Sequence, residues 1–167
     1  MKEKILMLFG FRKGGESFDK YSLHLVIIAL TIIIGATLYE LFFLETKRDF
    51  ILWGTIIFLL GAVIRTTARI QLGKLFTFNV KIMQDHKVKQ DGLYRYMRHP
   101  GYTGLLLEVI GWCIFFQTKL GAIATVIFLI PAGYYRIKIE EQTLEKAFGE
   151  EYKLYKKKVK ALIPFIL

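Results

Sequence analysis

Cysteine and histidine are scarce in this chain of 167 residues, and their scarcity argues against two kinds of site. Cys113 is the only cysteine, so no disulfide bond can form within the chain. The three histidines, His24, His86 and His99, have no metal-type spacing with each other or with Cys113, so no metal site is expected. Cys113 lies in an apolar stretch and is predicted to be a small buried hydrophobe.

The sequence also lacks the signatures of several common enzyme classes. It has no nucleophile elbow of the hydrolase type, no Walker loop, and no GxGxxG segment after a candidate strand. The polar sequence that remains is too short to build a soluble nucleotide-binding sheet. Any cofactor is therefore predicted to bind to loops and helix ends.

Apolar runs, in contrast, are long: 54% of the residues are hydrophobic and the mean hydropathy is +0.40. Residues 21–44 carry Glu40 as their only formal charge and exceed the roughly 20 residues that a helix needs to cross a bilayer. A second span is expected over 50–72. Residues 101–135 suit a helical hairpin with two arms of about 16 residues each, turning near 117–121. We predict an all-α polytopic membrane protein with about four transmembrane helices.

The distribution of basic residues predicts an orientation. All but three of the 24 lysines and arginines fall in residues 1–20, in 65–98, or from 136 onward. Short loops rich in Lys and Arg stay on the cytoplasmic side of a membrane. Four crossings with both termini in the cytoplasm fit this distribution. No cleavable signal peptide is expected, because no small-residue cleavage site follows the first apolar run.

We expect a single membrane-embedded domain over residues 1–167, with a cytoplasmic N-terminal segment at 1–20. Two polar blocks, 65–104 and 136–164, are expected to face the cytoplasm together. The net charge of +10 would also suit nucleic acid, but the chain has no recognisable nucleic-acid module. Topology and attraction to anionic membrane lipids account for the charge, so lipids are the expected partners.

The first block ends in YRYMRHPGYTG, which places charged residues directly before an apolar segment. Proline is favoured in the first turn of a helix, so the third span is predicted to begin at about Pro100. The free amide groups of its first turn would then lie beside Arg98 and His99, which suits a carboxylate or another anion. The alternative is that both side chains only contact lipid headgroups.

The second block contains Arg136 and Glu140, which are four residues apart and therefore lie on one face of a helix. Such a pair can share a ligand, or it can be an intrahelical ion pair worth a few tenths of a kcal/mol, about 0.3. Further along, Tyr152, Tyr155 and Val159 form a stripe with lysines around it. This pattern predicts an amphipathic C-terminal helix lying on the membrane surface.

The two blocks share an ordered set of residues with a known enzyme family. The set comprises Arg65, Ala68, Leu72, Gly73, Phe76, His86, Gly92, Tyr94, Arg98, His99, Pro100, Tyr102, Gly104, Arg136, Glu140, Glu141, Leu144, Phe148, Gly149, Glu151, Tyr152, Tyr155 and Pro164. In this order and spacing, the chain resembles the isoprenylcysteine carboxyl methyltransferase family of integral membrane enzymes. About 100 residues take part in the resemblance.

The resemblance implies S-adenosyl-L-methionine as the cofactor, bound in a pocket on the cytoplasmic side. The residues that would wrap the cofactor are His86, Lys87, Val88, Lys89, Tyr94, His99, Pro100, Gly101 and Tyr102, with Glu140 contacting it from the second block. Arg136 would face the substrate, so Arg136 and Glu140 are the expected catalytic residues. Asn79 stands where some members of the family place a polar cofactor contact.

The methyl acceptor is expected to be lipophilic, but its reacting group is ambiguous. An arginine suffices to orient a carboxylate, whereas an amine would prefer a nearby carboxylate. Glu108, inside the third span, is a candidate substrate-binding residue because intramembrane carboxylates are usually functional. The resemblance at the His99 position favours methylation of a carboxylate, as on a prenylated cysteine. The alternatives are N-methylation of phosphoethanolamine-type lipids and a non-catalytic scaffold or transporter. The oligomeric state stays open.

Overall fold

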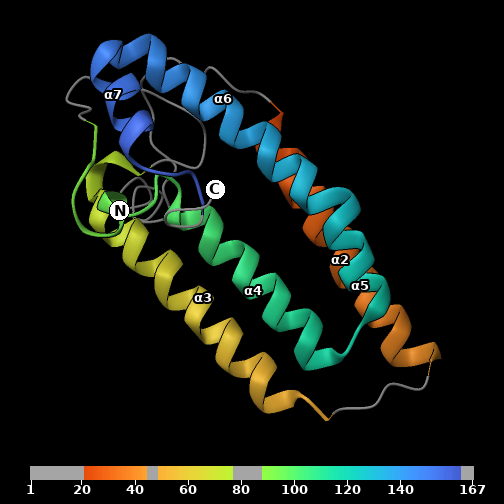
Figure 1. Cartoon of the computed structure of the whole chain (residues 1–167). Helices are drawn as coiled ribbons and strands as arrows, with labels where there is room; N and C mark the ends of the chain where they lie inside the picture. The colour runs from red at the N-terminus through yellow and green to blue at the C-terminus, as the bar shows by residue number, and fades with distance from the viewer. Residues whose placement is uncertain (1–20, 45–48, 77–87, 163–167) are drawn as a thin grey trace, which may run out of the picture.

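The computed structural model describes residues 21–44, 49–76 and 88–162, and the regular elements in these ranges are all helical (Figure 1). In chain order they are α2 (Ser22–Phe43), α3 (Ile51–Leu72), η1 (Gly73–Leu75), η2 (Gly92–Arg95), α4 (Pro100–Phe116), α5 (Lys119–Ala124), η3 (Thr125–Leu129), α6 (Ile130–Phe148) and α7 (Glu150–Lys158). The predicted all-α fold is therefore confirmed, including the first two spans and the start of α4 at Pro100.

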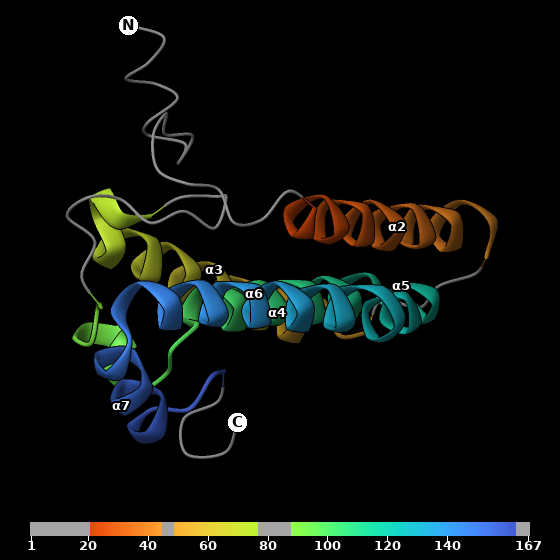
Figure 2. The same ribbon diagram turned by 90° about the horizontal axis from the view of Figure 1, so that it is seen from above.

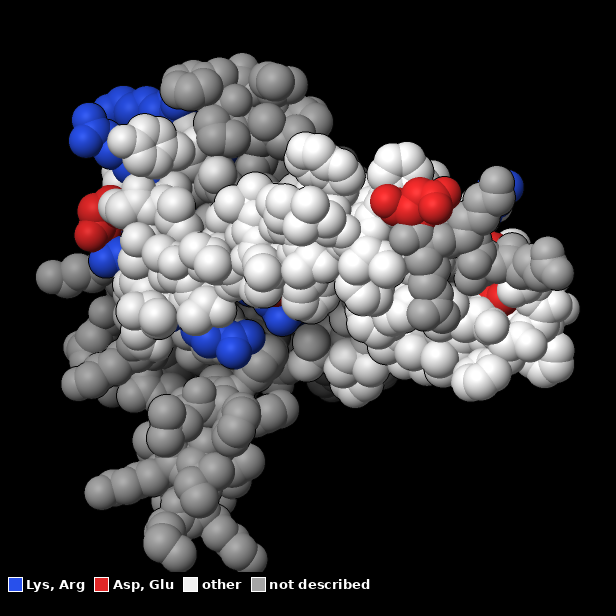
Figure 3. All heavy atoms as spheres, turned by 90° about the horizontal axis from the view of Figure 1, so that it is seen from below, with Lys and Arg blue, Asp and Glu red and all other residues white. Residues whose placement is uncertain are grey.

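Among the described residues, three helices are long and apolar enough to cross a membrane: 22–43, 51–72 and 119–148. The shorter apolar α4 completes the hairpin with the third of them. Figure 3 shows a broad uncharged surface across the described helices, with most of the visible Lys and Arg atoms in the left half of the view. The chain is an integral membrane protein, and its described part contains three long apolar helices and the shorter α4.

The second arm of the hairpin is longer than the sequence predicted. Instead of a pass of about 16 residues, α5, η3 and α6 form one continuous helix of 30 residues, from Lys119 to Phe148. Pro131 lacks an N–H, and the π-helical turn η3, which ends two residues before it, adjusts the hydrogen-bond ladder. The helix ends at Gly149, whose φ of 54° favours glycine.

Helices α3 and α4 pack against each other through four glycines. Gly54 and Gly61 lie on α3, and Gly104 and Gly111 lie on α4, each pair seven residues apart. A Cβ added to Gly61 would lie 2.6 Å from the backbone nitrogen of Glu108. One added to Gly111 would lie 2.4 Å from the nitrogen of Phe58. The two backbones approach this closely because glycine has no side chain.

Helix α2 runs beside α5 and α6 (Figure 1). Its buried residues repeat every three or four positions and so form one stripe: Ser22, Val26, Ala29, Ile33, Thr37 and Glu40. At the far end of this stripe Glu40 accepts hydrogen bonds from the Thr118 hydroxyl and from the backbone nitrogens of Lys119 and Leu120. Glu40 thus caps the first turn of α5 and ties α2 to the hairpin turn.

Helix α7 turns away from the end of α6 (Figure 2), and its Lys156 carbonyl oxygen accepts a hydrogen bond from Arg98, two residues before α4. Tyr152 and Tyr155 are only 2% and 5% exposed. The prediction that these tyrosines lie on the membrane surface is therefore wrong, because they pack into the protein. After α7, Lys160 and Ala161 accept hydrogen bonds from the backbone nitrogens of Arg98 and His99. The segment that follows α7 is thereby held against the start of α4.

Candidate active site

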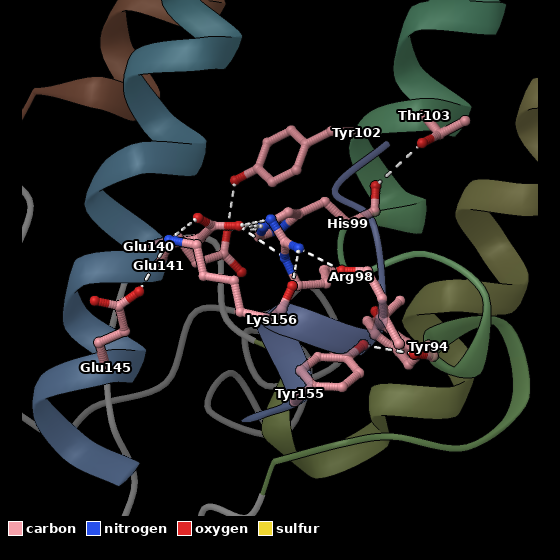
Figure 4. A network of polar contacts seen from close by, with 11 residues as sticks. Tyr94, Arg98, His99, Tyr102, Thr103, Glu140, Glu141, Glu145, Tyr155 and Lys156 are labelled. Carbon is pink, nitrogen blue, oxygen red and sulfur yellow. Dashed lines mark hydrogen bonds and ion pairs between the residues drawn. The ribbon is translucent and has the colours of Figure 1, made fainter. Parts of the chain in front are cut away.

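Polar side chains converge where the start of α4 meets the middle of α6 and the helix α7 (Figure 4). Tyr102 comes from α4 and lies between Arg136 and Glu140 of α6. Its hydroxyl donates to the Glu140 carboxylate at 2.9 Å and accepts from Arg136 Nε at 2.8 Å. The expected shared face of Arg136 and Glu140 is therefore present, and one tyrosine hydroxyl from another helix links the two residues.

His99 lies directly before α4 and is 4% exposed. Its Nε2 is 3.2 Å from Glu141 Oε1, and its Nδ1 is 3.9 Å from Glu140 Oε2. Both carboxylates of the acidic pair therefore approach the same imidazole. Its ring also packs edge-on against Tyr102, with the centroids 5.7 Å apart. Glu141 also binds Lys156 at 2.8 Å, and the hydrogen bond to Glu141 raises the pKa of this lysine.

The guanidinium of Arg98 pairs with a carboxylate of the protein itself, that of Glu141. Its Nε and Nη2 donate to Glu141 Oε1 at 2.9 Å and 2.7 Å. Its Nη1 donates to the carbonyl oxygens of Lys156 and Val159, at the end of α7. Through these contacts Arg98, two residues before α4, joins the start of α4 to α6 and α7. The anion expected at the first-turn amides of α4 stays a prediction.

Tyr94, in η2, closes this end of the site from the side of α3. Its hydroxyl donates to the carbonyl oxygen of Ala68 at 3.3 Å, and its own carbonyl accepts from the Tyr155 hydroxyl at 2.5 Å. Burial raises the pKa of both phenols, that of Tyr155 to about 12. Both tyrosines therefore stay neutral hydrogen-bonding groups at physiological pH.

Comparison with known proteins identifies the family. The profile of the isoprenylcysteine carboxyl methyltransferase (ICMT) family matches residues 54–146. A probable protein-S-isoprenylcysteine O-methyltransferase from Oryza sativa subsp. indica is 36% identical over 115 residues, which cover 68% of this chain and 60% of the rice protein. The chain belongs to the ICMT family. Protein-S-isoprenylcysteine O-methyltransferase B from Arabidopsis thaliana is 34% identical over 116 residues, covering 68% of this chain and 59% of that protein.

A solved structure has the same fold. It is described as the eukaryotic intramembrane Ras methyltransferase ICMT, without a monobody, and it matches this chain with a TM-score of 0.68 and 29% sequence identity. The match covers 89% of this chain but 55% of the solved chain. This ICMT-family chain therefore spans about half to three fifths of the length of these relatives.

The structure brings together only some of the residues expected to bind a cofactor in this ICMT-family protein. Tyr94, His99, Pro100, Gly101 and Tyr102 gather around the start of α4. Val88 and Lys89 precede η2, where Lys89 forms an exposed ion pair with Asp91 at 3.0 Å. Asn79, His86 and Lys87 lie outside the described residues.

The described residues fit adenosylmethionine chemically. This cofactor carries a sulfonium and an ammonium cation as well as ribose hydroxyl groups, which suit carboxylates and aromatic rings. The Glu140 side chain is 32% exposed, so it remains accessible to a ligand. At Gly101 in the first turn of α4, no described atom outside the adjoining turn lies within 4 Å of the position that an added Cβ would occupy. Glu140, His99, Tyr102 and the backbone at Gly101 would hold the cofactor.

Glu108 lies elsewhere in the fold. Its carboxylate forms an ion pair with Arg65 of α3 at 3.0 Å, across the glycine contact of α3 and α4. The Glu108 side chain is 9% exposed and that of Arg65 is 42% exposed. The structure thus supplies a partner for this intramembrane carboxylate, and its role in substrate binding stays a prediction.

Two residues, Glu141 and Ser22, were assigned no role in the site from the sequence. Glu141 directly follows Glu140, and two adjacent glutamates in the sequence were a signal that both carboxylates could approach the start of α4. Ser22 of α2 accepts a hydrogen bond from Arg136 Nη1 at 2.9 Å. No sequence signal connects these residues, because they are 114 positions apart and serine is common in membrane helices.

Proposed function

We propose that this protein transfers a methyl group from adenosylmethionine to the carboxylate of a lipophilic acceptor, such as a prenylated cysteine. The observation that carries the proposal is the Tyr102 bridge between Arg136 and Glu140, at the polar end of a bundle of apolar helices. An anion-binding and a cation-binding group are thereby held side by side. Membership in the ICMT family and the names of its relatives support the same reaction.

Glu140 and His99 are assigned to the cofactor. When bound, adenosylmethionine supplies an electrophilic methyl group on its sulfonium. The Glu140 carboxylate complements the positive charge and accepts hydrogen bonds, while Tyr102 fixes the orientation of Glu140 by donating to it at 2.9 Å. The imidazole of His99 is held between the carboxylates of Glu140 and Glu141, which orients its ring beside Glu140.

Arg136 is assigned to the acceptor. A carboxylate is already a nucleophile, so the protein needs to orient it, align it for in-line displacement and exclude water. A guanidinium can pair with a carboxylate through two parallel N–H···O bonds, which fixes both its distance and its plane. Arg136 is 7% exposed, so such a pair would form away from bulk water.

The site is proposed to face the cytoplasm, together with both chain termini. The exposed lysines of α7 and the start of α4 lie at the same end of the bundle, which fits the side on which basic residues are retained. A lipophilic acceptor would then reach Arg136 from the membrane, and a soluble cofactor would reach Glu140 from the cytoplasm.

Methyl transfer from labelled adenosylmethionine tests the proposal. Purified protein in detergent is incubated with an S-farnesylated, N-acetylated cysteine, and the lipid product is treated with base. A methyl ester releases labelled methanol, so base-labile label is expected. Phosphatidylethanolamine is offered in a parallel reaction. Base-stable label on phosphatidylethanolamine alone would replace the proposal with N-methylation of a lipid amine. Absence of label on both acceptors would contradict methyl transfer to the carboxylate and to the amine.

A further inference from the structure

Ser22 brings a hydroxyl into the buried stripe of α2, which its neighbours fill with apolar groups. It is the first residue of the helix and is 0% exposed. The next members of the stripe are Val26, Ala29 and Ile33. Apolar packing against α6 does not require a hydroxyl, and a buried hydroxyl needs a hydrogen-bond partner. The partner here includes Arg136, whose Nη1 donates to the Ser22 oxygen at 2.9 Å.

This contact gives the Arg136 guanidinium a second anchor. The first anchor is Tyr102 of α4, which accepts from Nε at 2.8 Å, and the second is Ser22 of α2. A guanidinium is planar and has five N–H donors, and Tyr102 and Ser22 accept from two different nitrogens of this one. Two anchors on different nitrogens and from different helices fix the plane of the group. The plane matters because guanidinium groups recognise carboxylates through paired, coplanar hydrogen bonds.

We propose that Ser22 is a positioning residue for the methyl acceptor: its hydroxyl holds the Arg136 guanidinium in the orientation that the acceptor carboxylate requires. The inference rests on the proposed function and extends it, because it makes α2 part of the acceptor site. Ser22 does not contact the reacting atoms in this account. It acts through Arg136, whereas the cofactor side of the site depends on Glu140 and His99.

Removal of the hydroxyl tests the proposal. Ser22→Ala is expected to raise the KM for the farnesylcysteine acceptor about 3- to 10-fold, the size of one lost hydrogen bond. The dissociation constant of the cofactor is expected to stay within about twofold of the wild-type value. Ser22→Thr retains a hydroxyl and is expected to restore most of the acceptor KM.

Thr37→Val provides the matched control for a general loss of stability. Thr37 is also 0% exposed on α2, and its hydroxyl accepts from Trp112 Nε1 at 3.2 Å, near the opposite end of the helix. This variant also loses one buried hydroxyl but is expected to leave the acceptor KM unchanged. In an Arg136→Lys background, Ser22→Ala is expected to change the KM less than about twofold, because the group that it positions is gone.

The outcomes separate this inference from the function on which it rests. An unchanged acceptor KM for Ser22→Ala, with an active wild-type protein, overturns the role of Ser22 and leaves the proposed function intact. The positioning role is also overturned if Thr37→Val raises the acceptor KM as much as Ser22→Ala does, or if Ser22→Ala raises the KM equally in the Arg136→Lys background. Either result would mean that Ser22 contributes only to packing. A folded wild-type protein that binds the cofactor but transfers no methyl group to the carboxylate overturns both.

Discussion

At the scale of single residues, the account depends on the division of roles between Arg136 and Glu140. The two lie on one face of α6, and Tyr102 contacts both. A structural ion pair on a helix would make them equivalent, so that either change would cost similar stability. In the proposed site their roles differ, because Arg136 binds the acceptor and Glu140 binds the cofactor.

Arg136→Ala and Glu140→Ala are therefore expected to have separable effects. Arg136→Ala should cost about 2 to 4 kcal/mol of acceptor recognition or transition-state stabilisation, because it removes the group that orients the carboxylate. Glu140→Ala should mainly weaken cofactor binding. Cofactor affinity, thermal midpoint and turnover are measured for both variants. Equal losses of stability with unchanged cofactor affinity would assign the two residues to a structural pair.

Glu141 is expected to be a structural residue of the site. It accepts from Arg98, lies beside His99 and pairs with Lys156, with 11% of its side chain exposed. Glu141→Gln leaves the buried guanidinium of Arg98 without its charged partner, which should cost about 3 kcal/mol of stability.

The thermal midpoint in detergent measures this loss for Glu141. Glu145→Gln is the matched control, since Glu145 pairs with Lys156 at 2.9 Å but its side chain is 32% exposed. The control should cost less than about 1 kcal/mol. Equal midpoints for the two variants would contradict a structural role for Glu141.

At the scale of elements, hydropathy and helix-start chemistry predicted most of the helices. Backbone N–H groups in the first turn of a helix have no partner within the helix, so proline, which lacks this group, is well suited to the first turn. Pro100 therefore indicated the beginning of α4. The close approach of α3 and α4 was not predicted, because a glycine in one helix does not reveal which helix it meets. The burial of Tyr152 within the protein was not predicted for a related reason. An apolar helix face has the same sequence pattern whether it contacts lipid or protein.

Added methyl groups at the glycine contact test the packing of α3 against α4. Gly61→Ala would place a Cβ 2.6 Å from the backbone of α4, so a loss of about 1 to 3 kcal/mol is expected despite the better helix propensity of alanine. Gly133→Ala on α6 is the control, since no described atom lies within 4 Å of its added Cβ. A thermal midpoint of Gly61→Ala that equals or exceeds that of the control would rule out close backbone packing.

At the scale of the whole molecule, the polar end of the bundle should face the cytoplasm. In a Cys113→Ala background, single cysteines replace Lys157 of α7 and Asp49 at the start of α3, which lie near opposite ends of the bundle (Figure 1). A membrane-impermeant thiol reagent on intact cells should label position 49, and position 157 only after permeabilisation. The reverse pattern would invert the topology and remove the basis of the charge argument.

Part of the candidate site could be predicted from helical spacing, and the family resemblance supplied the rest of the expected residues. Arg136 and Glu140 follow from helical spacing, and His99 and Tyr102 flank Pro100. Ser22 could not be predicted, since its contact joins the first span to the last one. Contacts of this kind depend on how the helices are arranged, which periodicity does not specify.

Binding of the cofactor tests the central claim most directly, because every assigned role requires adenosylmethionine at the polar end of the bundle. Its demethylated product, S-adenosylhomocysteine, is titrated calorimetrically into the purified protein in detergent, with folding checked by a cooperative thermal transition. The account predicts one site per chain with a dissociation constant on the order of micromolar, and much weaker binding to Glu140→Ala. Absence of binding heat with folded wild-type protein would contradict the methyltransferase account.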